Sequence, residues 1–207
     1  MYYYRPMGIL RSVQRTLGCA LVVLLFGGCL STETMISLRD DGSGTVDLVY
    51  RIDREAWETG VFDDSDAARP VPVSRRDFDR AVLQIEGLRL RSHRIVRDGD
   101  PVTVTARVDF DDVDALRLLL GAELLEVRLS DGGGHWRQVI APGRGSPQAQ
   151  ELARSLEGYE MSFRLTPPGP LVSGSEGAVP GADAASLTVS LSDIVTAVEP
   201  IVWEVRW

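Results

Sequence analysis

The residue types that most often carry catalysis are sparse in this chain. Its 207 residues include two histidines, His93 and His135, and two cysteines, Cys19 and Cys29. Neither histidine has a partner at the spacing of a metal site or a catalytic triad, and no Gly-x-Ser-x-Gly elbow is present. Almost any chain can bring a serine, a histidine and an aspartate together in space, so their presence alone indicates nothing. We therefore expect no enzyme activity, no catalytic residues and no cofactor.

Two acidic clusters contain the oxygen ligands that calcium prefers. Four aspartates lie within residues 109–114, and three more lie in a predicted loop at 62–73. The first cluster lacks the glycine and terminal glutamate of an EF-hand, and acidic side chains are also common in the first turn of a helix. The glycine run at 132–134 precedes a predicted strand, which favours a hairpin turn over a phosphate loop. The sequence therefore predicts no metal or phosphate site.

One basic cluster lies in this otherwise acidic chain, and it consists of Arg89, Arg91, Arg94 and Arg97. Their guanidinium groups could contact phosphate or carboxylate head groups through paired hydrogen bonds. A solvated outer face of a strand, paired with nearby acids, explains the same pattern, and we favour this explanation.

Three tryptophans are candidates for an apolar ligand pocket: Trp136, Trp203 and Trp207. Aromatic side chains at alternating strand positions usually pack in a core. If helices stand away from the sheet, however, these side chains would line a pocket of the kind that small ligands occupy. Both a filled core and an open cavity fit this pattern.

Residues 1–28 have the features of a secretory signal. Arg5, Arg11 and Arg15 come before an apolar run at 17–26, and no acidic residue is present. The run is about half of the ~20 residues that a membrane-spanning helix needs. We therefore expect a cleaved signal rather than a transmembrane anchor.

Two glycines lead from this apolar run directly into Cys29. The segment Leu25–Cys29 resembles the lipobox of bacterial lipoproteins. The resemblance implies cleavage between Gly28 and Cys29, lipidation of Cys29, and attachment to a membrane through its acyl chains. An ordinary signal peptide with a cysteine near the cleavage site is the alternative. Leu30 replaces the aspartate that commonly retains lipoproteins in the inner membrane, which favours the outer membrane in a diderm bacterium.

The remaining 179 residues are acidic and have no free thiol. Three of the 22 basic residues lie in the leader, so residues 29–207 contain 19 basic and 30 acidic residues and have a formal charge of −11. This charge argues against nucleic acid as a partner and against broad adhesion to anionic lipid. With Cys19 removed and Cys29 lipidated, no disulfide can form, so the core alone must hold the domain together.

The hydrophobic pattern repeats a strand–strand–helix unit three times. Alternating apolar residues predict hairpins at 36–52, 88–110 and 124–140. Helices are predicted after them, starting at Ser74, at Asp111 or Asp112, and at Ser146, and each ends at a glycine. In the first strand of the second hairpin, the alternation of apolar and polar residues is interrupted near His93, which predicts a β-bulge there.

The last part of the chain is predicted to be all strand. Strands are expected at 159–165, 187–191 and 201–207, with a mobile loop at about 167–185. We expect residues 29–207 to form one α+β domain. Its large antiparallel sheet would combine the three units with the C-terminal strands, and its helices would pack on one face.

The order of these elements resembles the LppM-type lipoprotein domain over most of residues 31–207. The resemblance rests on the Asp-Gly-Ser-Gly turn of the first hairpin, the Val-Asp-Phe strand before a leucine-rich helix, and the closing Trp-Glu-Val-Arg-Trp strand. Members are lipid-anchored envelope proteins, and binding of lipids or glycolipids in an apolar cavity has been suggested for some. The resemblance implies a non-enzymatic extracytoplasmic domain that binds a lipid or another amphiphile. A structural or adaptor lipoprotein that docks an envelope protein is the alternative.

Overall fold

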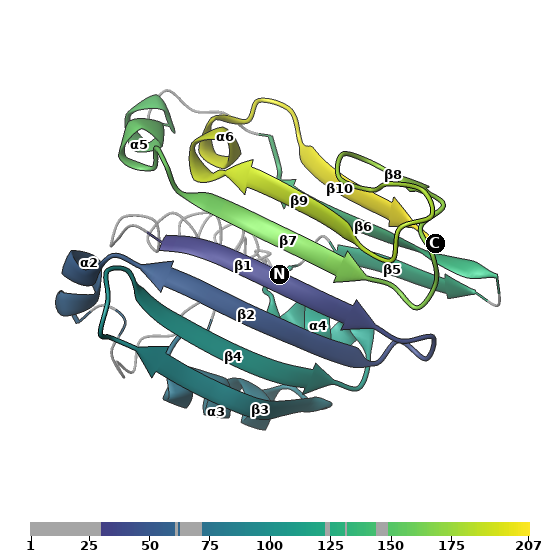
Figure 1. Cartoon of the computed structure of the whole chain (residues 1–207), viewed down its shortest axis with the longest axis horizontal. Coiled ribbons are helices and arrows are strands. Elements are labelled where there is room, and N and C mark those ends of the chain that lie inside the picture. Colours follow the sequence, from purple (N-terminus) through teal and green to yellow (C-terminus); the bar gives the residue numbers. More distant parts are fainter. Residues whose placement is uncertain (1–29, 61, 63–71, 123–124, 131, 144–148) are drawn as a thin grey trace, which may run out of the picture.

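The computed structural model describes residues 30–60, 62, 72–122, 125–130, 132–143 and 149–207 (Figure 1). The predicted signal segment, Cys29 and the aspartates at 63, 64 and 66 lie outside these residues. The α+β class predicted from the sequence is confirmed, because a large sheet and several helices share one core.

The strands form two sheets. The larger sheet has six strands in the order β3-β4-β2-β1-β7-β9. These are β1 (Leu30–Leu38), β2 (Gly44–Ile52), β3 (Leu88–Val96), β4 (Val102–Phe110), β7 (Glu160–Thr166) and β9 (Ala185–Ser190). The smaller sheet has four strands in the order β5-β6-β10-β8. These are β5 (Leu125–Ser130), β6 (Gly133–Ala141), β8 (Ser173–Gly174) and β10 (Ile201–Arg206).

The two sheets pack face to face through aromatic side chains. Phe163 of β7 lies 6.2 Å from Trp203 of β10, measured between ring centroids, and Trp203 meets Trp136 of β6 edge to face at 6.3 Å. Trp136 and Trp203 are both fully buried. The smaller sheet therefore covers the part of the larger sheet that contains β7.

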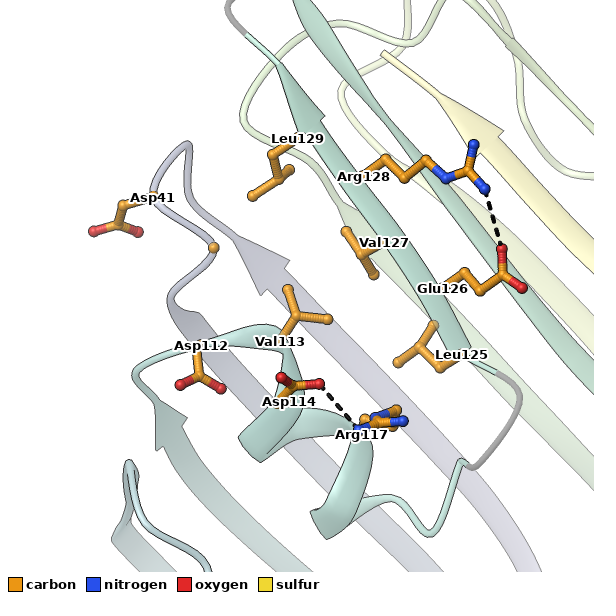
Figure 2. A pocket seen from close by; sticks show the side chains of 11 residues that line it. Asp41, Asp112, Val113, Asp114, Arg117, Leu125, Glu126, Val127, Arg128 and Leu129 are labelled. Carbon is orange, nitrogen blue, oxygen red and sulfur yellow. Dashed lines mark ion pairs between the residues drawn. The ribbon is translucent and has the colours of Figure 1, made fainter.

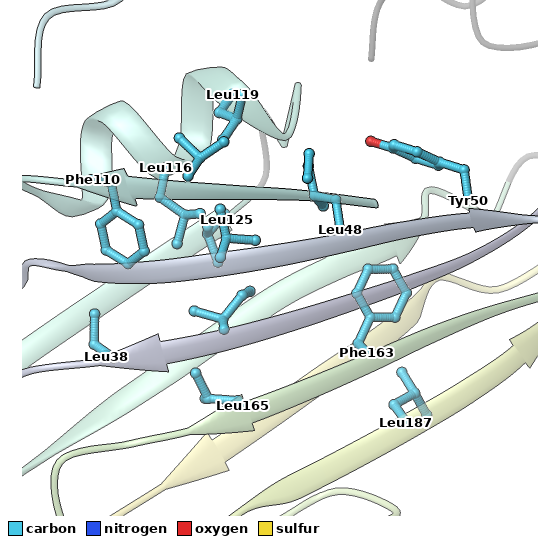
Figure 3. Close-up of a cluster of buried hydrophobic side chains, with 14 of the residues drawn as sticks. Leu38, Leu48, Tyr50, Phe110, Leu116, Leu119, Leu125, Phe163, Leu165 and Leu187 are labelled. Carbon is cyan, nitrogen blue, oxygen red and sulfur yellow. The ribbon is translucent and has the colours of Figure 1, made fainter. Parts of the chain in front are cut away.

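Five helices are described: α2 (Arg54–Glu58), α3 (Arg75–Gln84), α4 (Val113–Leu119), α5 (Ala149–Ser155) and α6 (Leu191–Thr196). The predicted start of α3 at Ser74 is confirmed. A capping box forms it, because the Ser74 hydroxyl accepts from the Asp77 amide and the Asp77 carboxylate accepts from the Ser74 amide. Phe78 of this helix packs against His93 of β3. Figure 3 shows Leu116 and Leu119 of α4 in the same apolar layer as strand residues of the larger sheet. The helices and the smaller sheet therefore cover different parts of the larger sheet.

The local predictions for the three hairpins are confirmed, and the predicted irregularity in β3 is a register shift between Leu90 and Ser92. One long-range pairing differs from the predicted antiparallel arrangement. β7 pairs with β1 in parallel, with Thr34 opposite Phe163. β7 begins beside the start of β1, where the Glu160 amide lies 3.5 Å from the Ser31 hydroxyl oxygen, so the two strands run in the same direction (Figure 1).

The segment 167–184 is more ordered than the mobile loop predicted from its composition. Leu171 is 2% exposed, its amide donates to the Ala182 carbonyl at 2.9 Å, and its carbonyl accepts from the Gly181 amide at 2.7 Å. Within the segment, β8 pairs with β10. One buried leucine and these backbone hydrogen bonds fix a segment that is otherwise rich in glycine and alanine.

Trp203 tests the packing of the two sheets. We expect Trp203→Ala to lower the free energy of unfolding by about 3–5 kcal/mol, because it opens a cavity where the sheets meet. Urea unfolding followed by far-ultraviolet circular dichroism measures this change. Leu83→Ala is the control, since Leu83 is 87% exposed, and it should leave stability within about 0.5 kcal/mol of the wild type. Equal effects of the two substitutions would contradict the sheet packing described here.

Candidate functional site

The four arginines of the basic cluster do not converge on one point. Arg89 pairs with Asp111, and Arg91 Nε donates to Asp109 Oδ2 at 2.6 Å. The guanidinium of Arg97 lies 5.4 Å from the ring centroid of Trp57. Arg94 has an exposed side chain on the same strand. Two of the four positive charges are therefore already neutralised by aspartates, and contact with an anionic head group stays a prediction.

The four aspartates within residues 109–114 form ion pairs with arginines or cap a helix. Asp109 and Asp111 hold the arginines of β3, Asp112 caps α4 by accepting from the Ala115 amide at 2.8 Å, and Asp114 pairs with Arg117 at 3.1 Å. The hydrogen bond from Arg91 holds the pKa of Asp109 below its ordinary value. Within the described ranges, no group of three or more histidine, cysteine or acidic side chains is suited to a metal ion.

The two histidines lie far apart in the fold and have structural neighbours. His93 Nε2 lies 2.9 Å from the Val73 carbonyl oxygen, which ties β3 to the residue before the α3 cap. His135 Nε2 lies 4.0 Å from a Glu204 carboxylate oxygen, and that carboxylate also pairs with Arg137 at 3.2 Å. Neither arrangement presents a nucleophile next to the imidazole.

The three candidate tryptophans are all buried, and one of them, Trp207, also borders a groove. Trp136 and Trp203 are fully buried between the sheets, and their indole nitrogens have no acceptor among the described residues. The buried Tyr50 hydroxyl likewise has no partner there, and its burial raises its pKa above the ordinary range. Trp136 and Trp203 fill the core, whereas Trp207 is 7% exposed and reaches a surface groove.

We call this first groove the Trp207 groove. It has a volume of about 630 Å³ and is lined by Asp40, Leu129, Ser130, Gly132, Gly133, Pro168, Gly169, Pro170, Val172 and Trp207. The backbone of Trp207 pairs with Gly134, with N···O distances of 2.8 and 3.1 Å. A Cβ atom at Gly134 would lie 2.2 Å from the indole ring, so the absence of a side chain there lets the ring lie across β6. Asp40 is the one charged side chain of the lining, and slightly more of the exposed lining is polar than apolar.

A second groove of about 610 Å³ lies between α4 and β5, and we call it the α4–β5 groove (Figure 2). Its lining residues are Asp41, Gly42, Asp112, Val113, Asp114, Arg117, Leu125, Glu126, Val127, Arg128 and Leu129. All five consecutive residues from Leu125 to Leu129 belong to this lining, so the groove runs along the length of β5. Its lining has four acidic and two basic side chains, whereas the lining of the Trp207 groove has one charged side chain.

Leu129 lines both grooves and separates them. Gly42, in the turn between β1 and β2, has a φ of +83°, which glycine adopts without strain. A Cβ atom there would lie 3.3 Å from Leu129 Cδ1 and 3.8 Å from Val113 Cγ2. The β1–β2 turn therefore touches both β5 and α4 at this point, and one side chain of β5 bounds the two candidate sites.

Both grooves lie at the end of the molecule opposite the start of β1. They are lined by Asp40 and Asp41, which follow the last residue of β1. β1 begins at Leu30, which follows Cys29 in the sequence. No helix among the described residues is both long and apolar enough to cross a membrane.

Sequence reasoning found Trp207 but missed the grooves themselves. Residues 125–129 gave a strand pattern like that of any hairpin, and nothing local marks β5 as the edge of a separate sheet. Leu129 of this strand is 37% exposed, as is Val96 at the end of β3, the edge strand of the larger sheet.

Comparisons with known proteins give a likeness in structure and none in sequence. No family model matches the chain, and no curated protein matches it. The NMR structure of the folded domain of Mycobacterium tuberculosis LppM is similar, with a TM-score of 0.48 and 11% sequence identity, covering 87% of this chain and 90% of that one. At these values the likeness carries no inference about function.

The ion pair between Arg91 and Asp109 predicts a pH dependence. Because the folded pKa of Asp109 is lowered, the pair stabilises the fold above the unfolded value of about 3.9, and this contribution is lost as the pH falls through the folded pKa. Arg91→Gln should lower stability at pH 7 by less than about 1 kcal/mol, since Arg91 is largely exposed. The difference from wild type should vanish in strong acid. Urea unfolding at several pH values measures it.

Arg94→Gln is the matched control for this pH dependence, because Arg94 lies on the same strand and no ion pair of its side chain is seen among the described residues. We expect its effect on stability to be the same at every pH. A constant difference for Arg91→Gln across the whole pH range would contradict the role given to Asp109.

Proposed function

We propose that this chain is a lipid-anchored protein of the bacterial cell envelope whose non-enzymatic extracytoplasmic domain binds a lipid or another amphiphile. The anchor would be the acyl chains on Cys29, after cleavage between Gly28 and Cys29. The apolar run, the two glycines and the cysteine support this part of the proposal.

The Trp207 groove is the observation that carries the binding part of the proposal. Its volume of about 630 Å³ lies within the usual range for ligand sites. Trp207, Leu129, Val172 and two prolines offer an apolar surface, while Asp40 offers one charge at the same site. An amphiphile matches this combination, because it has an apolar part to bury and a polar part to leave in water.

The start of β1 sets how far this groove lies from the membrane. β1 has nine residues, and at about 3.3 Å per residue it spans roughly 30 Å. Because β1 follows Cys29 directly, its first residue lies at the anchor and its last residue lies next to the groove. A ligand in the Trp207 groove would therefore be held outside the bilayer that anchors the protein. This geometry suits a protein that receives or presents an amphiphile.

An adaptor that docks an envelope protein is the second candidate function. One observation favours it: the α4–β5 groove exposes a strand edge that a partner chain can pair with.

The anchor is tested by Cys29→Ser in the full chain. We expect this substitution to prevent lipidation and to move the protein from the membrane fraction to the aqueous fraction, as measured by cell fractionation and immunoblotting. Cys19→Ser is the control and should leave the protein in the membrane. If Cys29→Ser stayed in the membrane with its leader uncleaved, the apolar run itself would be the anchor.

Binding in the Trp207 groove is tested by Val172→Asp. This residue lines the groove and is 65% exposed, so a charge there should spare the fold and weaken amphiphile binding by about tenfold. Titration with fluorescent fatty acid and with fluorescent lysophospholipid measures the affinity. Val179→Asp is the matched control, because Val179 is 64% exposed and does not line the groove. Equal affinities of the two variants would place any bound amphiphile elsewhere.

A further inference from the structure

β5 is an edge strand of the smaller sheet, and within that sheet it pairs only with β6. In an antiparallel pair, successive residues direct their backbone groups alternately toward the partner strand and away from it. The amide of Leu125 donates to the Ala122 carbonyl at 3.1 Å, so it points away from β6. By this alternation, the backbone groups of Val127 and Leu129 also point away from β6.

The far side of β6 confirms this phase. Gly134, which lies opposite Leu129, directs its amide and its carbonyl to Trp207. Gly134 therefore has neither group available for Leu129. No hydrogen bond of the described residues engages the amide or carbonyl of Val127 or Leu129 on the open side. Two residues of β5 thus present free donors and acceptors to the α4–β5 groove.

The side chains around this edge are arranged for an extended segment. Leu125, Val127 and Leu129 point toward Val113 of α4, whereas Glu126 and Arg128 extend to the other side of the strand (Figure 2). A strand placed alongside β5 would meet apolar side chains on one of its faces and charged side chains on the other. That alternation is the pattern of a half-buried β-strand.

The charge of the α4–β5 groove indicates the charge of the segment that would bind there. Its four acidic and two basic lining residues give a formal charge of −2. Arg117 pairs with Asp114 at 3.1 Å and Arg128 with Glu126 at 3.7 Å, which leaves Asp41 and Asp112 without a cationic partner in the lining. Hydrogen bonds from the Ser43 side chain and amide hold the pKa of Asp41 below its ordinary value.

We infer that the open edge of β5 is a docking site for an extended, basic segment of a partner protein, which adds a strand to the smaller sheet inside the α4–β5 groove. The backbone groups of Val127 and Leu129 bind the segment, and the acidic side chains select its charge. The site shares only Leu129 with the Trp207 groove, and binding of the segment requires neither an amphiphile nor the anchor.

A second copy of this chain fits the edge less well than a single segment does. α4 and the β1–β2 turn form the opposite wall of the groove, so the edge of another folded domain would have to enter between them. Two copies also carry like charge, since each chain has a formal charge of −8. One extended segment with positive charge meets neither obstacle.

The test uses the full-length protein as isolated from cells, in phosphatidylcholine nanodiscs when it is membrane-bound. The probe is a fluorescein-labelled peptide in which valine alternates with lysine, and fluorescence anisotropy reports its binding. We expect saturable binding of this peptide. The same peptide with glutamate in place of lysine, and a version N-methylated at every second amide so that those donors are lost, should each bind at least about tenfold more weakly.

Substitutions in β5 assign the binding to this edge. Val127→Pro removes an amide that takes no part in the ladder with β6, and it should weaken binding of the valine–lysine peptide by about tenfold. Val127→Thr keeps the amide and a β-branched side chain, so it should bind as the wild type does. Glu126→Gln should weaken binding modestly, whereas Glu160→Gln, which lies outside the groove, should leave it unchanged.

Three results would overturn the inference. The first is equal binding of the N-methylated and unmodified peptides, because the segment would then not pair with a strand. The second is equal binding by Val127→Pro and Val127→Thr, which would locate the peptide elsewhere. The third is a dimer of the full-length protein by mass photometry that Val127→Pro dissociates, because a second copy would then occupy the edge.

Discussion

The packing of two sheets of unequal width is the constraint on which the rest of the molecule depends. The contact of Phe163 with Trp203 joins the smaller sheet to the β7 side of the larger one, so helices must cover the remaining strands. Next to this boundary, the smaller sheet ends at β5 and faces α4 across a groove. The edge of β5 is therefore open because the smaller sheet ends there and α4, rather than another strand, covers the adjoining part of the core.

The contact between Leu129 and the β1–β2 turn determines the shape of the surface at this end. Gly42 allows the turn to approach Leu129 and Val113 closely, and this contact divides the surface into two grooves of different character. The Trp207 groove has a single charged side chain in its lining, whereas the α4–β5 groove is acidic and bounded by unpaired backbone groups. Both grooves lie at the end of β1 opposite its first residue, Leu30.

Local features of the fold could be predicted from the sequence, but its long-range arrangement could not. Alternating residues identified the hairpins, Ser74 and Asp77 identified the start of α3, and the loss of phase near His93 identified the shift in β3. The parallel pairing of Thr34 with Phe163 depends on the path of the chain through β6 and α5, which leaves no local pattern. The same holds for β5, whose sequence resembles that of any paired strand. Leu191 was assigned to a strand because it continues the alternation of Leu187 and Val189, but Ser190 caps a short helix there.

Residue-resolved amide hydrogen exchange by NMR tests the central claim most directly, because it reports which backbone groups of β5 are free in solution. The amides of Glu126 and Arg128 pair with β6 and should exchange slowly, whereas those of Val127 and Leu129 should exchange fast. Addition of the valine–lysine peptide should then slow the exchange of Val127 and Leu129 selectively. Equal protection of all four amides in the free protein would show that the edge of β5 is already covered, and would contradict the account.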